Sequence, residues 1–124
     1  MASCVTDRHE RQVTGRSTGA SPTTTTLAAP GVEQATVVDT IAVSNTTGGT
    51  ATFATVSVQR VSDSVVLWEI EVSGAPAVAP VLVAVIAPPG GIYKGLAGIQ
   101  LKVVVTMTGA TALKVNVNSH EEVP

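Results

Sequence analysis

The sequence predicts an all-β protein, an antiparallel β-sandwich or jelly roll of roughly six to eight short strands with an extended N-terminal arm. Two observations predict the body: from Glu33 onward apolar residues recur with a period of two, and Gly, Pro, Asn and Ser interrupt them at near-regular intervals. A third predicts the arm, because residues 1–31 are rich in Thr and Ser and bury too little apolar surface to offset the entropy of ordering them. We therefore expect an extended or disordered arm over residues 1–31 and a β-sandwich domain over residues 32–124.

The first half of the body is expected to contain three strands, over residues 37–43, 50–61 and 66–72. The run Ser-Asn-Thr-Thr-Gly-Gly at 44–49 predicts a turn between the first two. Apolar parity changes within the second strand, which predicts a bulge near Ala54 and Thr55. In the third strand, apolar and charged residues alternate cleanly, so Trp68 is expected on the core face; an interface anchor is its alternative role.

The second half is expected to contain three more strands. Residues 81–86 are continuously apolar and mostly β-branched, which favours a central strand covered on both faces. Residues 99–107 and 113–117 form the other two, separated by a break at Gly109 and Ala110. Between the Pro-Pro-Gly-Gly turn at 88–91 and residue 99, the chain is either a short strand or a loop anchored by Tyr93. The acidic tail after residue 118 is expected to fray.

Charge and composition favour a protein that packs against other proteins. Only 13% of the residues are charged and 44% are hydrophobic, a balance that suits a subunit of an assembly better than a free monomer. A net charge of −2, with one Trp, one Tyr and one Phe, argues against nucleic-acid binding. Arg8, Arg11 and Arg16 make the arm slightly basic, so it could settle on an acidic neighbour, although a solvated tail fits as well. These arginines and Tyr93 are the candidate protein-contact residues; a buried Tyr93 ring is the alternative.

No targeting or membrane segment is expected. Cys4 is the only cysteine, so the fold must hold without an internal disulfide. The first residues contain no apolar stretch typical of a secretory signal. The longest apolar run, at residues 78–89, contains Pro80 and is far shorter than the ~20 residues needed to span a bilayer. We expect synthesis in the cytoplasm and no contact with a membrane.

The sequence shows no arrangement of residues typical of an enzyme. His9 and His120 lie at opposite ends of the chain, and neither lies beside a nucleophile motif. His120 with Glu121 and Glu122 could bind a cation weakly, but we interpret this segment as a solvated terminus. Glu69 and Glu71 project from one face of a strand, which we interpret as its solvent-exposed side. We therefore predict no catalytic residue, metal, cofactor or small-molecule substrate.

Three segments carry a resemblance to a known group of proteins: residues 37–53 (VVDTIAVSNTTGGTATF), 87–96 (APPGGIYKGL) and 112–122 (ALKVNVNSHEE). They resemble the opening hairpin, a Gly-Gly-Tyr turn and the final strand of small β-sandwich virion structural proteins of tailed bacteriophages. The resemblance spans residues 35–122 and implies no functional residue, because its motifs are strand and turn residues. It implies a virion component, either a capsid decoration (cement) protein or a part of a tail or fibre.

These observations lead to one main hypothesis and two alternatives. The main hypothesis is a capsid decoration protein on the outer surface of a phage head, a homo-oligomer whose partners are the major capsid protein and its own copies. In it, the arm extends over neighbouring capsid subunits, so deletion of residues 1–30 should weaken incorporation into virions. The first alternative is a tail, collar or fibre component. The second is a carbohydrate-binding module, which would need an exposed aromatic platform.

Overall fold

The computed structural model describes residues 11–17, 23–78 and 81–124, and in these ranges the chain is all-β and antiparallel, without a helix. Consequently, no helix in these ranges is long and apolar enough to cross a membrane. The strands described are β1 (Arg11–Ser17), β2 (Thr23–Thr26), β3 (Ala35–Arg60), β4 (Val66–Val78), β5 (Val81–Ile86), β6 (Tyr93–Lys94) and β7 (Leu101–Glu122).

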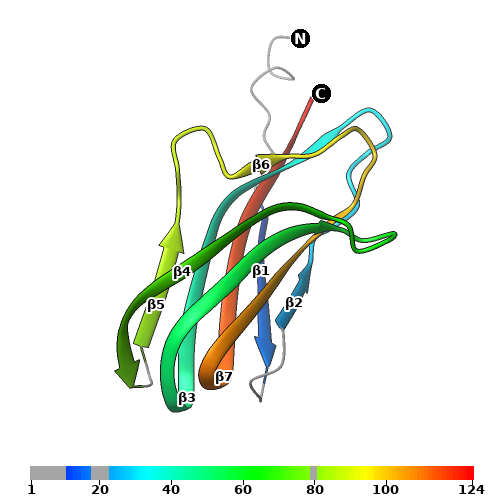
Figure 1. Cartoon of the computed structure of the whole chain (residues 1–124). Helices are drawn as coiled ribbons and strands as arrows, with labels where there is room; N and C mark the ends of the chain where they lie inside the picture. Colours follow the sequence, from blue (N-terminus) through cyan, green and yellow to red (C-terminus); the bar gives the residue numbers. More distant parts are fainter. Residues whose placement is uncertain (1–10, 18–22, 79–80) are drawn as a thin grey trace.

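Two long strands, β3 and β7, form the frame of the molecule. They pair antiparallel along nearly their whole length, from Ala35 opposite Glu122 to Arg60 opposite Leu101. Both strands curve together at one end of the molecule, where the pairing register shifts between Gly49 and Phe53 (Figure 1). Glycines and bulges allow such a corner, because they let a strand bend sharply without losing its neighbour. The ribbon is thereby folded so that its two halves face each other.

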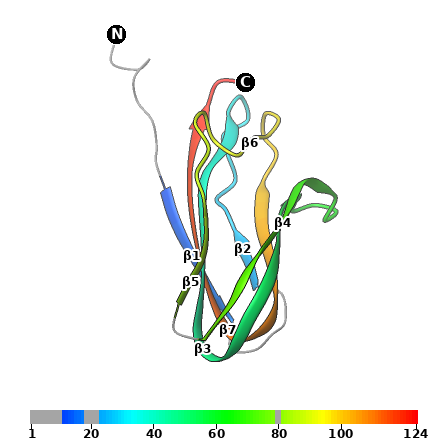
Figure 2. The same ribbon diagram turned by 60° about the vertical axis from the view of Figure 1, so that its left-hand side comes forward.

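The folded ribbon creates two layers, and the other strands extend each layer at its edges. The first layer runs β1, the end of β7, the start of β3, then β5. The second runs β2, the start of β7, the end of β3, then β4. The short β6 pairs with Val37 and Val38 at the end of the first layer. Figure 2 shows the layers side by side. This strand order, in which one antiparallel ribbon is folded across two sheets, is that of a jelly roll.

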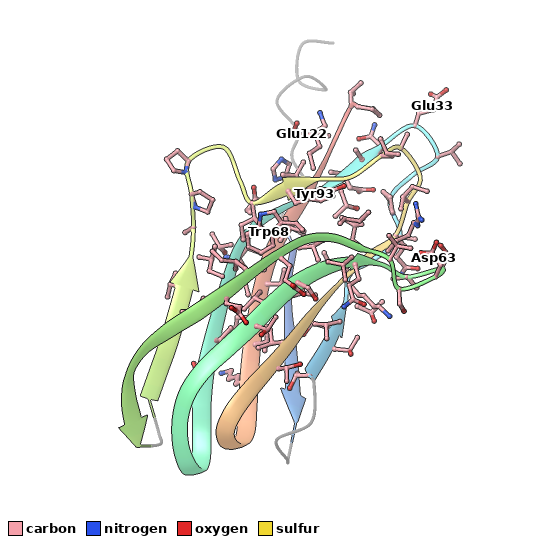
Figure 3. The ribbon with its side chains drawn as sticks, viewed as in Figure 1. Glu33, Asp63, Trp68, Tyr93 and Glu122 are labelled. Atoms are coloured by element: carbon pink, nitrogen blue, oxygen red, sulfur yellow. The ribbon has the colours of Figure 1, made fainter. Side chains whose placement is uncertain are left out.

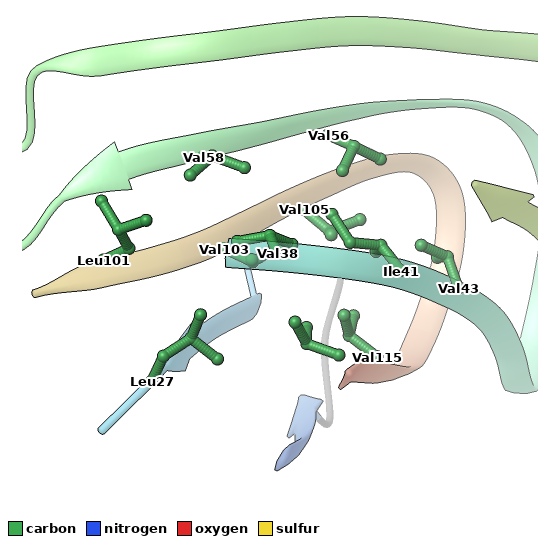
Figure 4. Packing of buried hydrophobic residues seen from close by; sticks show 11 residues of the cluster. Leu27, Val38, Ile41, Val43, Val56, Val58, Leu101, Val103, Val105 and Val115 are labelled. Carbon is green, nitrogen blue, oxygen red and sulfur yellow. The ribbon is translucent and has the colours of Figure 1, made fainter. Parts of the chain in front are cut away.

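The core lies between the two layers and is aliphatic (Figure 4). Inward-facing residues alternate along each strand, as Ile41 and Val43 do in the first layer and Val103 and Val105 in the second. Leu27, just after β2, fills the same core. Burial of apolar surface contributes about 25 cal/mol per Å², so this valine-rich core is the main source of stability. The predicted all-β sandwich and its alternation are confirmed.

The predicted hairpin turn at residues 44–49 is wrong, as is the predicted break at Gly109 and Ala110. Both stretches belong to continuous strands, and each forms one side of the corner where β3 and β7 bend together. Gly and Asn favour turns and strand corners alike, so their presence alone does not distinguish the two. The predicted bulge near Ala54 exists but lies slightly earlier, between Gly49 and Phe53.

The two edge strands β4 and β5 also differ from expectation. Residues 81–86 were predicted to form a central strand, yet in the described structure β5 pairs only with β3, and Val85 is 58% exposed. Trp68 on β4 packs against the core as predicted, but it is only half-buried. Ile70 shares its alternation and is 40% exposed, because an edge strand is covered on one side only. Val66 lies beyond a register shift, pairs with Gln59 and is 48% exposed.

The predicted boundary after residue 31 does not coincide with a boundary of the sheet. β1 pairs with residues 113–119 of β7, and β2 pairs with residues 102–105. Thr23, Thr25 and Leu27 are buried. The low apolar content of residues 1–31 predicted an arm outside the core. The described strands of this segment instead join the sheet by main-chain hydrogen bonds to the edge of β7, which require no apolar side chains. Arg8 lies outside the described residues.

Substitution of Thr25 by Val should stabilise the protein by about 1 kcal/mol. Thr25 is buried opposite Val103, and its hydroxyl has no hydrogen-bond partner in the described structure. Valine keeps the shape and removes the cost of burying an unpaired hydroxyl. The free energy of unfolding in urea measures the effect. Thr24→Val, at the adjacent exposed position, is the matched control and should change stability by less than about 0.5 kcal/mol. A destabilised Thr25→Val variant would contradict the burial of this hydroxyl.

Candidate functional site: a buried histidine between two carboxylates

A cluster of ionisable side chains lies where the end of β7 meets β3 and β6. The His120 side chain is 2% exposed, and its two ring nitrogens contact two different carboxylates. Nδ1 lies 2.5 Å from Oδ2 of Asp39, and Nε2 lies 2.6 Å from Oε2 of Glu122. Figure 3 labels Glu122 and Tyr93 near this end of the molecule. We call Asp39, His120, Glu122 and Lys94 the C-terminal clamp.

Local irregularity in the β3–β7 pairing produces the clamp. Val38 pairs with Ser119 and Thr40 pairs with Asn118, so the register shifts here and Asp39 is an extra residue in β3. A bulge of this kind redirects a side chain relative to the regular alternation. His120 and Glu122 are two residues apart on β7 and therefore project to the same side of that strand. The bulge thus brings an acidic side chain from β3 to a histidine 81 residues away in the sequence.

The geometry fixes how many protons the clamp holds. A doubly protonated imidazole donates one hydrogen bond to each carboxylate. With a neutral ring, one nitrogen must accept, so the carboxyl facing it must be protonated. Either arrangement contains one proton more than a neutral histidine between two carboxylates. With the doubly protonated ring both short contacts are charge-assisted hydrogen bonds; with the neutral ring only the contact to the ionised carboxylate is.

Further contacts tie the end of β7 to its surroundings. Lys94 Nζ donates to Glu122 Oε1 at 3.3 Å and to the main-chain oxygen of Val123 at 2.9 Å. The main-chain N–H of Gly31 donates to Oε1 of Glu121 at 2.9 Å. The predicted fraying of this tail, and its interpretation as a solvated terminus, are therefore wrong: β7 continues to Glu122, and Ser119 and His120 are buried. The acidic residues are held by partners on two other segments, β6 and the connection before β3.

The clamp is suited to holding strands together rather than to catalysis. Both imidazole nitrogens already contact carboxylate oxygens, and the ring is buried. Among the described residues, no group of three or more His, Cys, Asp or Glu side chains is arranged to hold a metal ion. The sequence places His120 and Glu122 close together, but nothing in it indicates their contact with Asp39, because Asp39 is distant in the chain and His120 departs from the alternation of Val115 and Val117.

The candidate contact residues are spread over the fold rather than gathered. Tyr93 lies in β6 opposite Val38, half-buried and packed against the core. The Tyr93 ring therefore fits the alternative of a buried ring better than a fully exposed contact residue. Arg11 and Arg16 lie on β1, opposite Ser119 and Lys114 of β7.

The outward face of the second layer has a neutral centre. Strand alternation and register place uncharged residues there on β2, the start of β7 and the end of β3, namely Thr24, Thr26, Thr55, Val104 and Thr106; Ser57 shares this alternation but is buried. Lys102 lies on one side of this patch, and the exposed Glu69 and Glu71 of β4 lie on another. We call it the threonine face. An uncharged centre with charges at the rim is typical of protein–protein contact surfaces.

Loss of the Glu122 contacts in acid should destabilise the protein. The hydrogen bond from His120, followed by that from Lys94, lowers the pKa of Glu122 below its ordinary value of 4.5, against a partial opposing effect of burial. A carboxylate with a lowered pKa in the folded state stabilises the fold above the pKa of the unfolded chain, and this contribution disappears as the pH falls. The stability difference between wild type and Glu122→Gln should be full at neutral pH and shrink below about pH 4.5. A pH-independent difference in urea unfolding would contradict the contact.

Comparisons with known proteins give similarity to solved structures only. No protein-family model and no curated protein matches the chain. The fold is similar to the VLP of the giant freshwater prawn Macrobrachium rosenbergii extra small virus, with a TM-score of 0.39 and 13% identity over 94% of this chain and 80% of that one. It is similar to the VP2 subviral particle of infectious bursal disease virus, with a TM-score of 0.29 and 12% identity, covering 97% of this chain and 38% of that one. The Gt strain of the same virus gives a TM-score of 0.29 and 15% identity, over 94% of this chain and 30% of that one.

Proposed function

We propose that the chain is a structural protein of a virus particle, and more specifically a capsid decoration protein on the outer surface of a phage head. The observation that carries the proposal is the threonine face, a neutral strand surface bordered by charges. Desolvation of such a face against another protein costs less than desolvation of a charged face. The partners are further copies of this chain and the major capsid protein.

The overall architecture supports an adhesive role. Two hydrogen-bonded layers around a valine core give a rigid body that presents broad outer faces. The low proportion of charged residues suits burial against neighbouring subunits. The resemblance of residues 35–122 to phage virion proteins supports the same role.

A charge placed in the threonine face tests the proposal. Thr106 is exposed at this face, so Thr106→Glu should leave the free energy of unfolding within about 0.5 kcal/mol of wild type. Occupancy on capsids should fall at least about tenfold, since a buried unpaired charge costs more than 1.4 kcal/mol. Glu71→Gln, on exposed β4 at the rim, is the matched control and should bind nearly normally. Normal occupancy of folded Thr106→Glu would exclude this face as the contact.

Two further measurements separate decoration from other virion roles. Copy number per particle, from quantitative mass spectrometry, should be in the hundreds for a decoration protein and at most tens for a tail, collar or fibre component. Expressed alone, a decoration protein should form small symmetric oligomers. Closed shells made by this chain alone would instead identify it as the shell subunit.

A further inference from the structure

Within residues 11–17, 23–78 and 81–124, the N-terminal strands β1 and β2 pair with the rest of the sheet through β7 alone. In the described structure β1 hydrogen-bonds only to residues 113–119 of β7, and β2 only to residues 102–105. β1 is the edge of the first layer and β2 the edge of the second. Because no strand among the described residues pairs with their other sides, the two strands could leave without disturbing any other described strand pairing.

The inward side of β2 is weakly attached. Thr23 and Thr25 are buried against the core, yet neither hydroxyl has a hydrogen-bond partner in the described structure. An unpaired buried hydroxyl opposes docking of the strand that carries it. The main apolar contribution comes from Leu27, which is 1% exposed; its N–H donates to the oxygen of Leu101 at 3.0 Å, and its oxygen accepts from Gln100 Nε2 at 2.7 Å.

Few contacts hold the backbone conformation of the connection between Leu27 and β3. Its residues are mostly exposed, with Pro30 the buried exception, and Val32 is 88% exposed. Three hydrogen bonds hold its present turn: Gln34 N–H to the oxygen of Gly31 at 3.0 Å, Gly31 N–H to Glu121 at 2.9 Å, and Gly98 N–H to the oxygen of Gln34 at 2.9 Å. Straightening this connection would break these few bonds and leave the two-layer core intact.

We propose that, in the assembled state, β1, β2 and Leu27 of one copy occupy the same positions on β7 of a neighbouring copy. This proposal rests on the proposed self-association and specifies how the copies are joined. Every main-chain hydrogen bond and the Leu27 contact are remade in the neighbour, so exchange needs no new complementary surface. The high local concentration of copies in an assembly favours the exchanged form over the closed monomer.

Disulfide trapping tests the exchange directly. Thr24 of β2 pairs with Val104 of β7, and Ser57 of β3 pairs with the same Val104. In a Cys4→Ser background, Thr24→Cys with Val104→Cys is oxidised in assembled protein and run on a non-reducing gel. Exchange predicts disulfides between chains, seen as dimers or a ladder. The matched control, Ser57→Cys with Val104→Cys, joins strands of the body and should crosslink only within one chain.

Two outcomes would overturn the exchange and keep it distinct from the proposed function. If assembled Thr24→Cys, Val104→Cys protein crosslinks within single chains, exchange is wrong while self-association stands, as sedimentation of the uncrosslinked protein would show. If the chain stays monomeric at all concentrations and on particles, exchange and self-association both fail. As an independent check, single variants Thr24→Cys and Val104→Cys on separate chains are mixed before assembly. A disulfide between the two kinds of chain supports exchange, and its absence contradicts it.

Discussion

Replacing His120 by Phe should lower the free energy of unfolding by about 3 kcal/mol at neutral pH. Phenylalanine fills a similar space but donates no hydrogen bond, so Asp39 and Glu122 would face each other across an apolar ring without their shared partner. The estimate is at the low end for a broken buried pair, because the two carboxylates keep part of their exposure, 26% and 44%. Urea unfolding followed by circular dichroism measures it.

An exposed ion pair provides the control for this variant. Arg60 contacts both carboxylate oxygens of Asp63, at 2.9 and 2.7 Å, but both side chains are largely accessible to water. Asp63→Asn should therefore lower the free energy of unfolding far less than His120→Phe does. A His120→Phe variant as stable as Asp63→Asn would show that the clamp contributes little to the fold.

Replacing Ile41 by Ala should destabilise the protein by about 3–4 kcal/mol. Ile41 is fully buried in the first layer, pairs with Val117 and Ile86, and belongs to the core between the layers. Truncation loses apolar burial and leaves a cavity that two hydrogen-bonded layers cannot close easily. The midpoint of urea unfolding should fall while its slope stays the same.

An exposed apolar residue serves as the control for Ile41. Leu96 lies in the loop before β7 and is 71% exposed. Leu96→Ala should change the free energy of unfolding by less than about 0.5 kcal/mol. A loss below about 1 kcal/mol for Ile41→Ala would mean that the two layers are not closely packed at this point.

Much of the fold could be predicted from local pattern. The alternation in residues 99–107 and 113–117 identifies the buried valines of β7, and Trp68 packs against the core as its position predicts. Local pattern could not separate a hairpin turn from a corner in a strand at Gly48 and Gly49, because glycine serves both. It could not find β2 either, since the four threonines dock by main-chain pairing.

The C-terminal clamp could not be predicted from the sequence for a different reason. Asp39 reaches His120 only because β3 has a bulge at that residue and because β3 and β7 pair from their opposite ends. Neither fact is encoded in the residues around His120. By contrast, the threonine face follows from the alternation of its strands once their register is known.

The most direct test of the proposed function is a cryo-EM reconstruction of particles that contain this protein. The account predicts jelly-roll density repeated at symmetric positions on the outer head surface, with the threonine face against a neighbouring subunit and β2 hydrogen-bonded to β7 of an adjacent copy. Density for this protein only at the tail, or density in which the threonine face is turned to solvent at every position, would contradict it.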